Sequence, residues 1–289
     1  MNKSFLKNAL IYFAIGMGLV RCSNYIKNDA SKNGLKRFDS GDYSGAVSAY
    51  NKALFFDFGR EKIFPNAGDA AIYASLCGAK VQTGQYKDAI KNCDRGIAID
   101  ASLPTSYLNR CTANQKLGNY QQAIKDCQKV ISLDPSNAKV HAGICQLKNV
   151  IGENKSALVA CNKALEIDPE SGMAYRNRCF VNGDLGNYQN TLSDCRKAVD
   201  INPKDKLPFL SLCRVNLMND RYDVALNQCN IAVKYLLNNP GLNTLPTAYF
   251  YRGVAYASVN KTELACNDWK KAKGLGVEDA QNLFGKYCK

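Results

Sequence analysis

The feature that most restricts how this 289-residue chain can fold is a period of 34 residues. Four regular copies read "GQYKDAIKNCDRGI" from Gly84, "GNYQQAIKDCQKVI" from Gly118, "GENKSALVACNKAL" from Gly152 and "GNYQNTLSDCRKAV" from Gly186. Less regular copies begin at Gly41, Asp220 and Asn260, the last displaced by the insertion "NNPGLNTLP". A unit of this size cannot bury its own apolar face, so the period predicts that the units stack into a continuous core.

Each unit has the pattern of two helices. The quoted segments read as second helices, and each is preceded by another amphipathic segment such as "SYLNRCTANQKL". Pro135, Pro169 and Pro203 end three of the units, because proline cannot continue a helix. The chain is therefore expected to be all-α.

Three columns of residues resemble the tetratricopeptide repeat. The first column is aromatic and contains Tyr73, Tyr107, Tyr175, Phe209 and Tyr249. The second contains only small residues, namely Ala46, Ala89, Ala123, Ala157, Ala225 and Ala265. The third is also small and contains Ala53, Gly96, Ala164, Ala198, Ala232 and Ala272. Val130, Thr191 and His141 depart from the pattern. The resemblance implies a helix-turn-helix solenoid, a right-handed superhelix, with about seven repeats over residues 27–276 and a capping helix over 277–289.

Cysteine fills two further columns sixteen residues apart. The first helices carry Cys77, Cys111, Cys145, Cys179 and Cys213, and the second helices carry Cys93, Cys127, Cys161, Cys195 and Cys229. In the first repeat the same places hold Gly34 and Tyr50, and in the last they hold Gly253 and Trp269. The two columns change together, as two positions in contact would. The alternative is that cysteine serves only as a small core residue, as it often does in cytosolic repeats of this kind.

Pairing within each repeat leaves no cysteine of these columns without a partner. The two positions lie at the same level on facing helices, where Cα atoms can approach to disulfide distance. We therefore predict five bonds inside repeats and a sixth between Cys266 and Cys288, with Cys22 left over. The strategy resembles that of the cysteine-rich Sel1-like repeat proteins of bacteria, which bridge their helices at other positions.

The first 21 residues resemble an export signal. Lys3 and Lys7 precede an uncharged apolar run, residues 9–20, which is too short to span a bilayer. We read residues 1–21 as a signal peptide or N-terminal anchor and Cys22 as a possible lipidation site, although Arg21 departs from the lipoprotein pattern. An exported protein in the periplasm, the cell envelope or the extracellular space is consistent with persistent disulfides.

The rest of the composition argues against several classes of function. The net charge of +13 is spread along the chain without a basic block, so nucleic-acid binding is not expected, and a membrane would be contacted only through the N-terminal segment or a lipid on Cys22. His141 is the single histidine, and no nucleophile or phosphate-loop motif accompanies it. Cysteine pairs strung along a rod do not converge on a metal. We expect neither an enzyme nor a cofactor.

The resemblance implies a concave groove lined by the first helices. The candidate residues are Leu108, Asn109, Thr112, Lys139, Gln146, Arg176, Asn177, Phe180 and Arg214. We expect a protein or peptide partner with an extended acidic segment: Arg176 and Arg214 would supply charge, and Asn109 and Asn177 would hold its backbone. Gly143 and Ser211 stand where clamp-type members carry carboxylate-binding arginines, which excludes recognition of a chaperone tail.

The sequence thus predicts a disulfide-stapled, exported scaffold that binds other proteins and has no catalytic activity. Two alternatives stay open: a protein that binds or modifies a cell-wall polymer, and a cytosolic adaptor with reduced cysteines.

Overall fold

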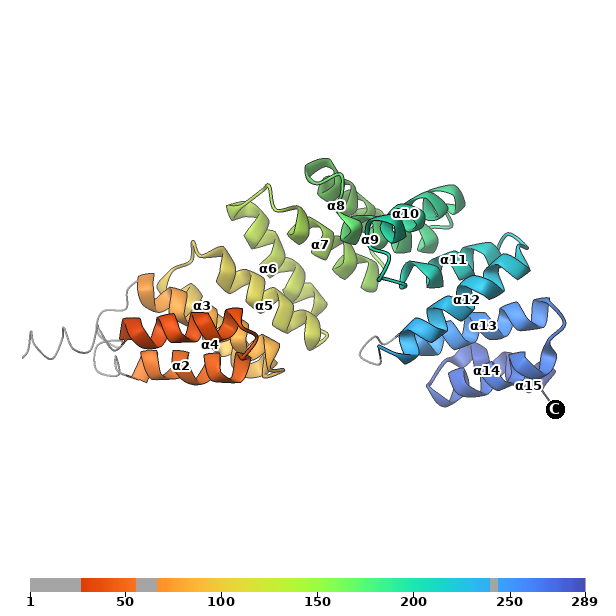
Figure 1. Cartoon of the computed structure of the whole chain (residues 1–289). Coiled ribbons are helices and arrows are strands. Elements are labelled where there is room, and N and C mark those ends of the chain that lie inside the picture. The colour runs from red at the N-terminus through yellow and green to blue at the C-terminus, as the bar shows by residue number, and fades with distance from the viewer. Residues whose placement is uncertain (1–26, 56–66, 240–243, 289) are drawn as a thin grey trace, which may run out of the picture. The chain divides into compact units, whose positions relative to one another are not determined.

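The computed structural model describes residues 27–55, 67–239 and 244–288, and every regular element in these ranges is a helix (Figure 1). The predicted export segment and Cys22 lie outside the described residues. After a first helix over 27–39, the helices are α2 (Tyr43–Phe55), α3 (Ala67–Gln82), α4 (Tyr86–Ile99), α5 (Pro104–Lys116), α6 (Tyr120–Leu133), α7 (Ala138–Val150), α8 (Asn154–Ile167), α9 (Gly172–Asp184), α10 (Tyr188–Ile201), α11 (Pro208–Leu217), α12 (Tyr222–Leu237), α13 (Leu245–Ser258), α14 (Thr262–Gly274) and α15 (Glu278–Tyr287).

The chain divides into two compact units at Pro135 and Ser136. Unit 1 contains the helices up to α6, and unit 2 contains α7 to α15. Within each unit, successive helices pack in pairs, α3 with α4 and α5 with α6, then α7 with α8 through α13 with α14. The first helix of one repeat also packs on that of the next, as α3 does on α5 and α7 on α9. This is the helix-pair stacking that the period predicts; the boundaries proposed for the domains remain predictions.

The turn inside each repeat requires a left-handed residue. Gly84, Gly118, Gly152 and Gly186 have φ between +74° and +79°, a conformation that costs glycine little and other residues more. Asp220 and Asn260 take the same place in the last two repeats with φ of 55° and 62°. Short polar side chains tolerate this region, so the turn persists without glycine.

Small residues bring the helices close together. The six alanines of the first small column, Ala46, Ala89, Ala123, Ala157, Ala225 and Ala265, are all completely buried. Thr191, which departs from that column, is also completely buried, and its hydroxyl donates to the carbonyl of Asn187 at 2.9 Å. That hydrogen bond avoids leaving a buried hydroxyl without a partner, so the departure is tolerated.

The six disulfides expected from the sequence are present in the structure. They are Cys77–Cys93, Cys111–Cys127, Cys145–Cys161, Cys179–Cys195, Cys213–Cys229 and Cys266–Cys288, with Cα–Cα distances of 5.1 to 5.8 Å. The ten cysteines inside repeats are at most 3% exposed. Each of these five bonds crosses the core of one helix pair, so the contact inferred from the paired columns is real.

The repeats that lack a cysteine pair use a ring against a glycine. A Cβ added to Gly34 would lie 2.7 Å from the Tyr50 ring, and one added to Gly253 would lie 2.5 Å from Trp269 Nε1. Both distances are too short for any side chain. The aromatic ring therefore fills the space that a disulfide occupies in the other repeats.

Gly253→Ala is expected to lower the free energy of unfolding of unit 2 by about 1–3 kcal/mol, because the new methyl group overpacks the core against Trp269. Gly143→Ala in α7 is the matched control: nothing lies within 4 Å of its added Cβ, so better helix propensity should stabilise by about 0.5–1 kcal/mol. Chemical denaturation of the two variants checks both signs. Equal changes in the free energy of unfolding for the two variants would mean that the packing of the Trp269 indole does not require glycine at position 253.

Candidate partner-binding groove

Unit 2 contains a hollow of about 390 Å³ between the first helices of its repeats, and we call it the unit-2 groove. It is lined by Gln146, Asn149, Val150, Phe180, Asp184, Leu207, Leu210, Ser211, Arg214, Thr244, Thr247 and Tyr251. These residues come from α7, α9, α11 and α13 and from the segments just before α11 and α13. Gln146, Phe180 and Arg214 are residues that the sequence analysis placed in a groove.

Apolar side chains form a large part of this surface. Val150 is 55% exposed, while Phe180, Leu207 and Leu210 are half-buried. Each such side chain keeps apolar area in contact with water that a ligand can cover. Complete burial of a side chain of this size favours association by about 1.5–3 kcal/mol before the costs of ordering the ligand.

One carboxylate connects three helices across the groove. Asp184 of α9 accepts a hydrogen bond from Asn149 Nδ2 of α7 at 2.6 Å and pairs with Arg214 Nη2 of α11 at 2.7 Å. Both members of the ion pair are only partly exposed, 33% for Asp184 and 23% for Arg214. The polar centre of the groove is therefore a pair with no net charge.

Gly183 makes room for this pair. A Cβ at that position would lie 2.8 Å from Arg214 Nη2, so any other residue would push the guanidinium away. Burial lowers the pKa of Arg214, but the hydrogen bond and negative charge of Asp184, with a smaller contribution from Tyr251, outweigh burial and raise the pKa overall. Arg214 is thus charged and fixed in place before any partner arrives.

Arg176 is also paired within the chain. Its Nη1 atom lies 2.8 Å from Asp205 Oδ2, and both side chains are mostly buried. The sequence suggests that Arg176 and Arg214 supply positive charge to an acidic ligand. In the structure, Asp205 and Asp184 already compensate both charges.

The two asparagines hold neighbouring repeats together. Asn109 Nδ2 donates to the carbonyl of Ala74, and Asn177 Nδ2 donates to that of Ala142, each at 2.9 Å. Asn177 is only 2% exposed. The Asn177 amide is therefore buried and used for packing between repeats, and a role in holding a partner's backbone stays a prediction. Asn109 is half-buried and makes the same contact.

The remaining candidates are spread over the two units. Leu108 is 38% exposed, and the Thr112 hydroxyl donates to its carbonyl at 3.0 Å. Lys139 is exposed in the first turn of α7. Leu108, Asn109 and Thr112 belong to unit 1 and the other six candidates to unit 2, so the nine residues do not form one site within a unit.

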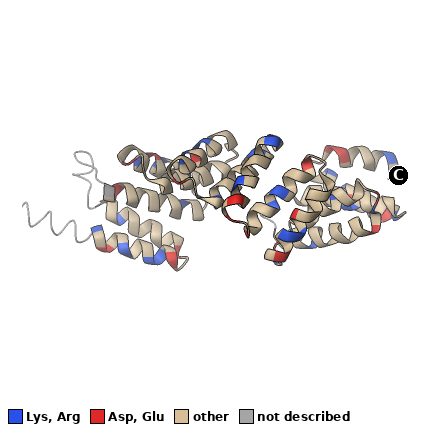
Figure 2. Ribbon diagram, turned by 90° about the horizontal axis from the view of Figure 1, so that it is seen from above, with Lys and Arg blue, Asp and Glu red and all other residues tan. Residues whose placement is uncertain are grey.

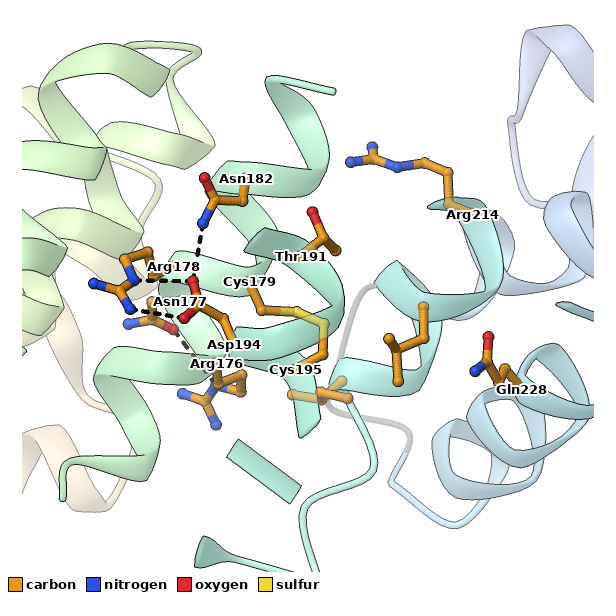
Figure 3. The surroundings of a disulfide bond; sticks show 12 residues. Arg176, Asn177, Arg178, Cys179, Asn182, Thr191, Asp194, Cys195, Arg214 and Gln228 are labelled. Carbon is orange, nitrogen blue, oxygen red and sulfur yellow. Dashed lines mark hydrogen bonds and ion pairs between the residues drawn. A yellow bond between two sulfur atoms is a disulfide. The ribbon is translucent and has the colours of Figure 1, made fainter. Parts of the chain in front are cut away.

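A second polar network, not predicted from the sequence, lies inside the repeats. Beside the Cys179–Cys195 bond, Arg178 donates to both carboxylate oxygens of Asp194, from Nε at 2.9 Å and from Nη2 at 2.7 Å (Figure 3). Asn182 Nδ2 adds a third hydrogen bond at 2.9 Å. Asp194 is 4% exposed. Its buried carboxylate accepts all three of these hydrogen bonds from side chains of the same repeat.

The same arrangement recurs in every second repeat. Arg110 with Asp126 and Arg252 with Asp268 form equivalent two-point pairs, and Asp126 and Asp268 are each 2% exposed. Each arginine also reaches the second helix of the preceding repeat, contacting Asp94, Asn162 and Asn230 in turn. The network therefore joins repeats in pairs. Comparing the residues just before the two cysteine columns would have revealed it, since arginine and aspartate occur there together.

The charges in the described parts of both units are mixed in sign, with acidic residues interspersed among Lys and Arg (Figure 2). Within the same ranges, no group of three or more His, Cys, Asp or Glu side chains is arranged to hold a metal ion. None of the helices in these ranges has the length and hydropathy needed to span a bilayer.

Comparison with known proteins agrees with the repeat architecture. Residues 104–137, which contain α5 and α6, match the family model for the tetratricopeptide repeat. No curated protein matches the sequence. A tetratricopeptide repeat protein from Parabacteroides merdae superposes with a TM-score of 0.66 at 17% identity, covering 92% of this chain and 100% of its own.

Two further solved structures share the fold. PilW, described as a widely conserved type IV pilus biogenesis factor, gives a TM-score of 0.61 at 14% identity and covers 74% of this chain and 97% of its own. MamA gives 0.52 at 22% identity, covering 63% and 94%. At these identities the likeness concerns the fold alone. The chain thus contains a tetratricopeptide repeat at residues 104–137 and has the tetratricopeptide repeat fold.

Proposed function

We propose that this protein is a non-catalytic scaffold of the cell envelope or extracellular space that holds a segment of another protein in the unit-2 groove. The observation that carries the proposal is the groove itself, a hollow with half-covered apolar side chains around a fixed polar pair. Six disulfides support an oxidising compartment, since such bonds are rare where thiols are kept reduced. The fold shared with PilW is consistent with a role in assembly.

The groove favours a segment with apolar anchors and little charge. Val150, Phe180 and Leu210 offer apolar contact, while Asp184 and Arg214 together offer an acceptor and a donor without net charge. A peptide backbone presents the matching donor and acceptor. An acidic segment would have to compete with Asp184 for Arg214, so we propose an uncharged extended segment in its place.

Selection of a random peptide library displayed on phage against the oxidised protein tests this choice. We expect the selected peptides to be rich in leucine, isoleucine and aromatic residues, and to lose binding by about tenfold or more with Val150→Glu, which places a charge on the apolar wall. Val159→Glu is the matched control, because Val159 is 69% exposed on α8 and does not line the groove. Enrichment of Asp and Glu in the selected peptides would contradict the uncharged segment and favour the acidic partner that the sequence predicts. Equal loss with both variants would place the binding surface elsewhere.

A further inference from the structure

The disulfide between Cys266 and Cys288 differs from the other five in its exposure. The ten cysteines inside repeats are at most 3% exposed, whereas Cys266 and Cys288 are both half-buried. Reduction begins when a thiolate attacks a sulfur atom directly, so access to sulfur decides which bond reacts in the folded protein. The bond at the C-terminal end is therefore the one that a reductant can reach without unfolding a repeat.

This bond holds a short helix, α15, most of whose residues are exposed. α15 is ten residues long, and Ala280 is its one buried residue. Leu283 and Phe284 are half-buried against the cluster that contains Trp269. An open hollow of about 460 Å³ is lined by Val254, Trp269, Leu283 and Tyr287, where α15 meets the last repeat. Short helices are unstable alone, and most of their stability comes from packing.

We propose that the Cys266–Cys288 disulfide is a reducible latch that keeps α15 on the end of the last repeat. A dithiol attacks one sulfur of the bond and forms a mixed disulfide. Its second thiol then displaces the remaining cysteine and closes the dithiol's own disulfide. Two electrons and two protons pass from the dithiol to Cys266 and Cys288, which become free thiols, while the five buried bonds persist. α15 then leaves and uncovers the apolar surface around Val254 and Trp269.

The chain carries its own reporter for this event. Trp269 is the single tryptophan, it is 2% exposed, and its ring lies 6.1 Å from that of Tyr287. Departure of α15 brings water to one side of the indole and shifts its emission maximum to longer wavelength. The maximum is the suitable readout, because loss of a nearby disulfide changes the intensity by itself.

The experiment treats the folded, oxidised protein with dithiothreitol, followed by alkylation and peptide mapping. We expect Cys266 and Cys288 to be labelled about tenfold or more faster than the ten buried cysteines, with a red-shifted emission maximum. Cys266→Ser with Cys288→Ser should give the same shift without reductant, and amide exchange in α15 should rise about tenfold or more while α13 stays protected. Parallel reduction of all six bonds would overturn the proposal. An α15 that stays protected in the double variant would overturn it as well.

Discussion

Replacing Cys145 and Cys161 together by alanine is expected to destabilise the repeat formed by α7 and α8 by about 3 kcal/mol in the oxidised protein. Both cysteines are completely buried, and their bond closes a short loop between facing helices. Removing it returns conformational freedom to the unfolded chain. In a solenoid each repeat contacts only its neighbours, so the loss should appear as local opening. Hydrogen exchange of the slowest amides in α7 and α8 measures it.

The control for this variant is the wild-type chain in reductant after unfolding and refolding. There the bond is absent from both proteins, and they differ only in two buried sulfur atoms, so the difference should shrink to about 1 kcal/mol or less. A difference that stays the same with and without the bond would mean that packing of sulfur, and not the cross-link, stabilises the repeat.

The cysteine pairing could be predicted because it depends on contacts inside one repeat. Such contacts recur at a fixed separation, so seven copies of the same contact can be compared along one chain. Gly34 with Tyr50 and Gly253 with Trp269 were as informative as the cysteines, since a change at one place matched a change at the other. The structure shows the physical reason: a ring or a disulfide fills the same space between the two helices.

The ion pairs made by Arg214 and Arg176 could not be predicted in this way. Arg214 pairs with Asp184 across two repeats, and Arg176 pairs with Asp205 in the segment before α11. Neither pair recurs in the other described repeats, so no repetition along the sequence points to it. When Asp184 and Asp205 are not recognised as their partners, both arginines are read as unpaired positive charges, and an acidic ligand is then expected. Which charged side chains meet depends on how helices of neighbouring repeats pack against each other. The repeat period of the sequence does not specify that packing.

The paired arginines and aspartates were open to the same comparison as the cysteines. Where the network is absent, the two positions hold Asn33 with Ala49, Leu76 with Asn92, Ile144 with Ala160, or Leu212 with Gln228. In that last repeat Asn216 Nδ2 donates to Gln228 Oε1 at 2.9 Å, which is the bond that Asn182 makes to Asp194 in the repeat before. At the same position between the two helices of a repeat, the chain therefore uses either an ionic network, as around Asp194, or a neutral hydrogen bond, as between Asn216 and Gln228.

Arg178→Leu alone is expected to destabilise unit 2 by about 3 kcal/mol, because it leaves the carboxylate of Asp194 buried without its counter-charge. Asp194 would keep one donor, Asn182. Arg178 is 25% exposed, so water can enter its place, and the cost should fall at the low end of the usual range. Denaturation of the oxidised protein, with hydrogen exchange in α9 and α10, measures the loss.

Adding Asp194→Gln to Arg178→Leu should recover most of that stability, to within about 1 kcal/mol of the wild type. The double variant copies the neutral repeat that contains Leu212 and Gln228, and Asn182 still finds a side-chain oxygen at the second position. Burying an ion pair costs both partners their water, so a neutral pair of similar size loses little when it replaces both together. If the double variant is as unstable as Arg178→Leu, the arginine contributes chiefly through its contact with Asn162 of the preceding repeat, and the network stabilises the stacking of repeats more than the repeat itself.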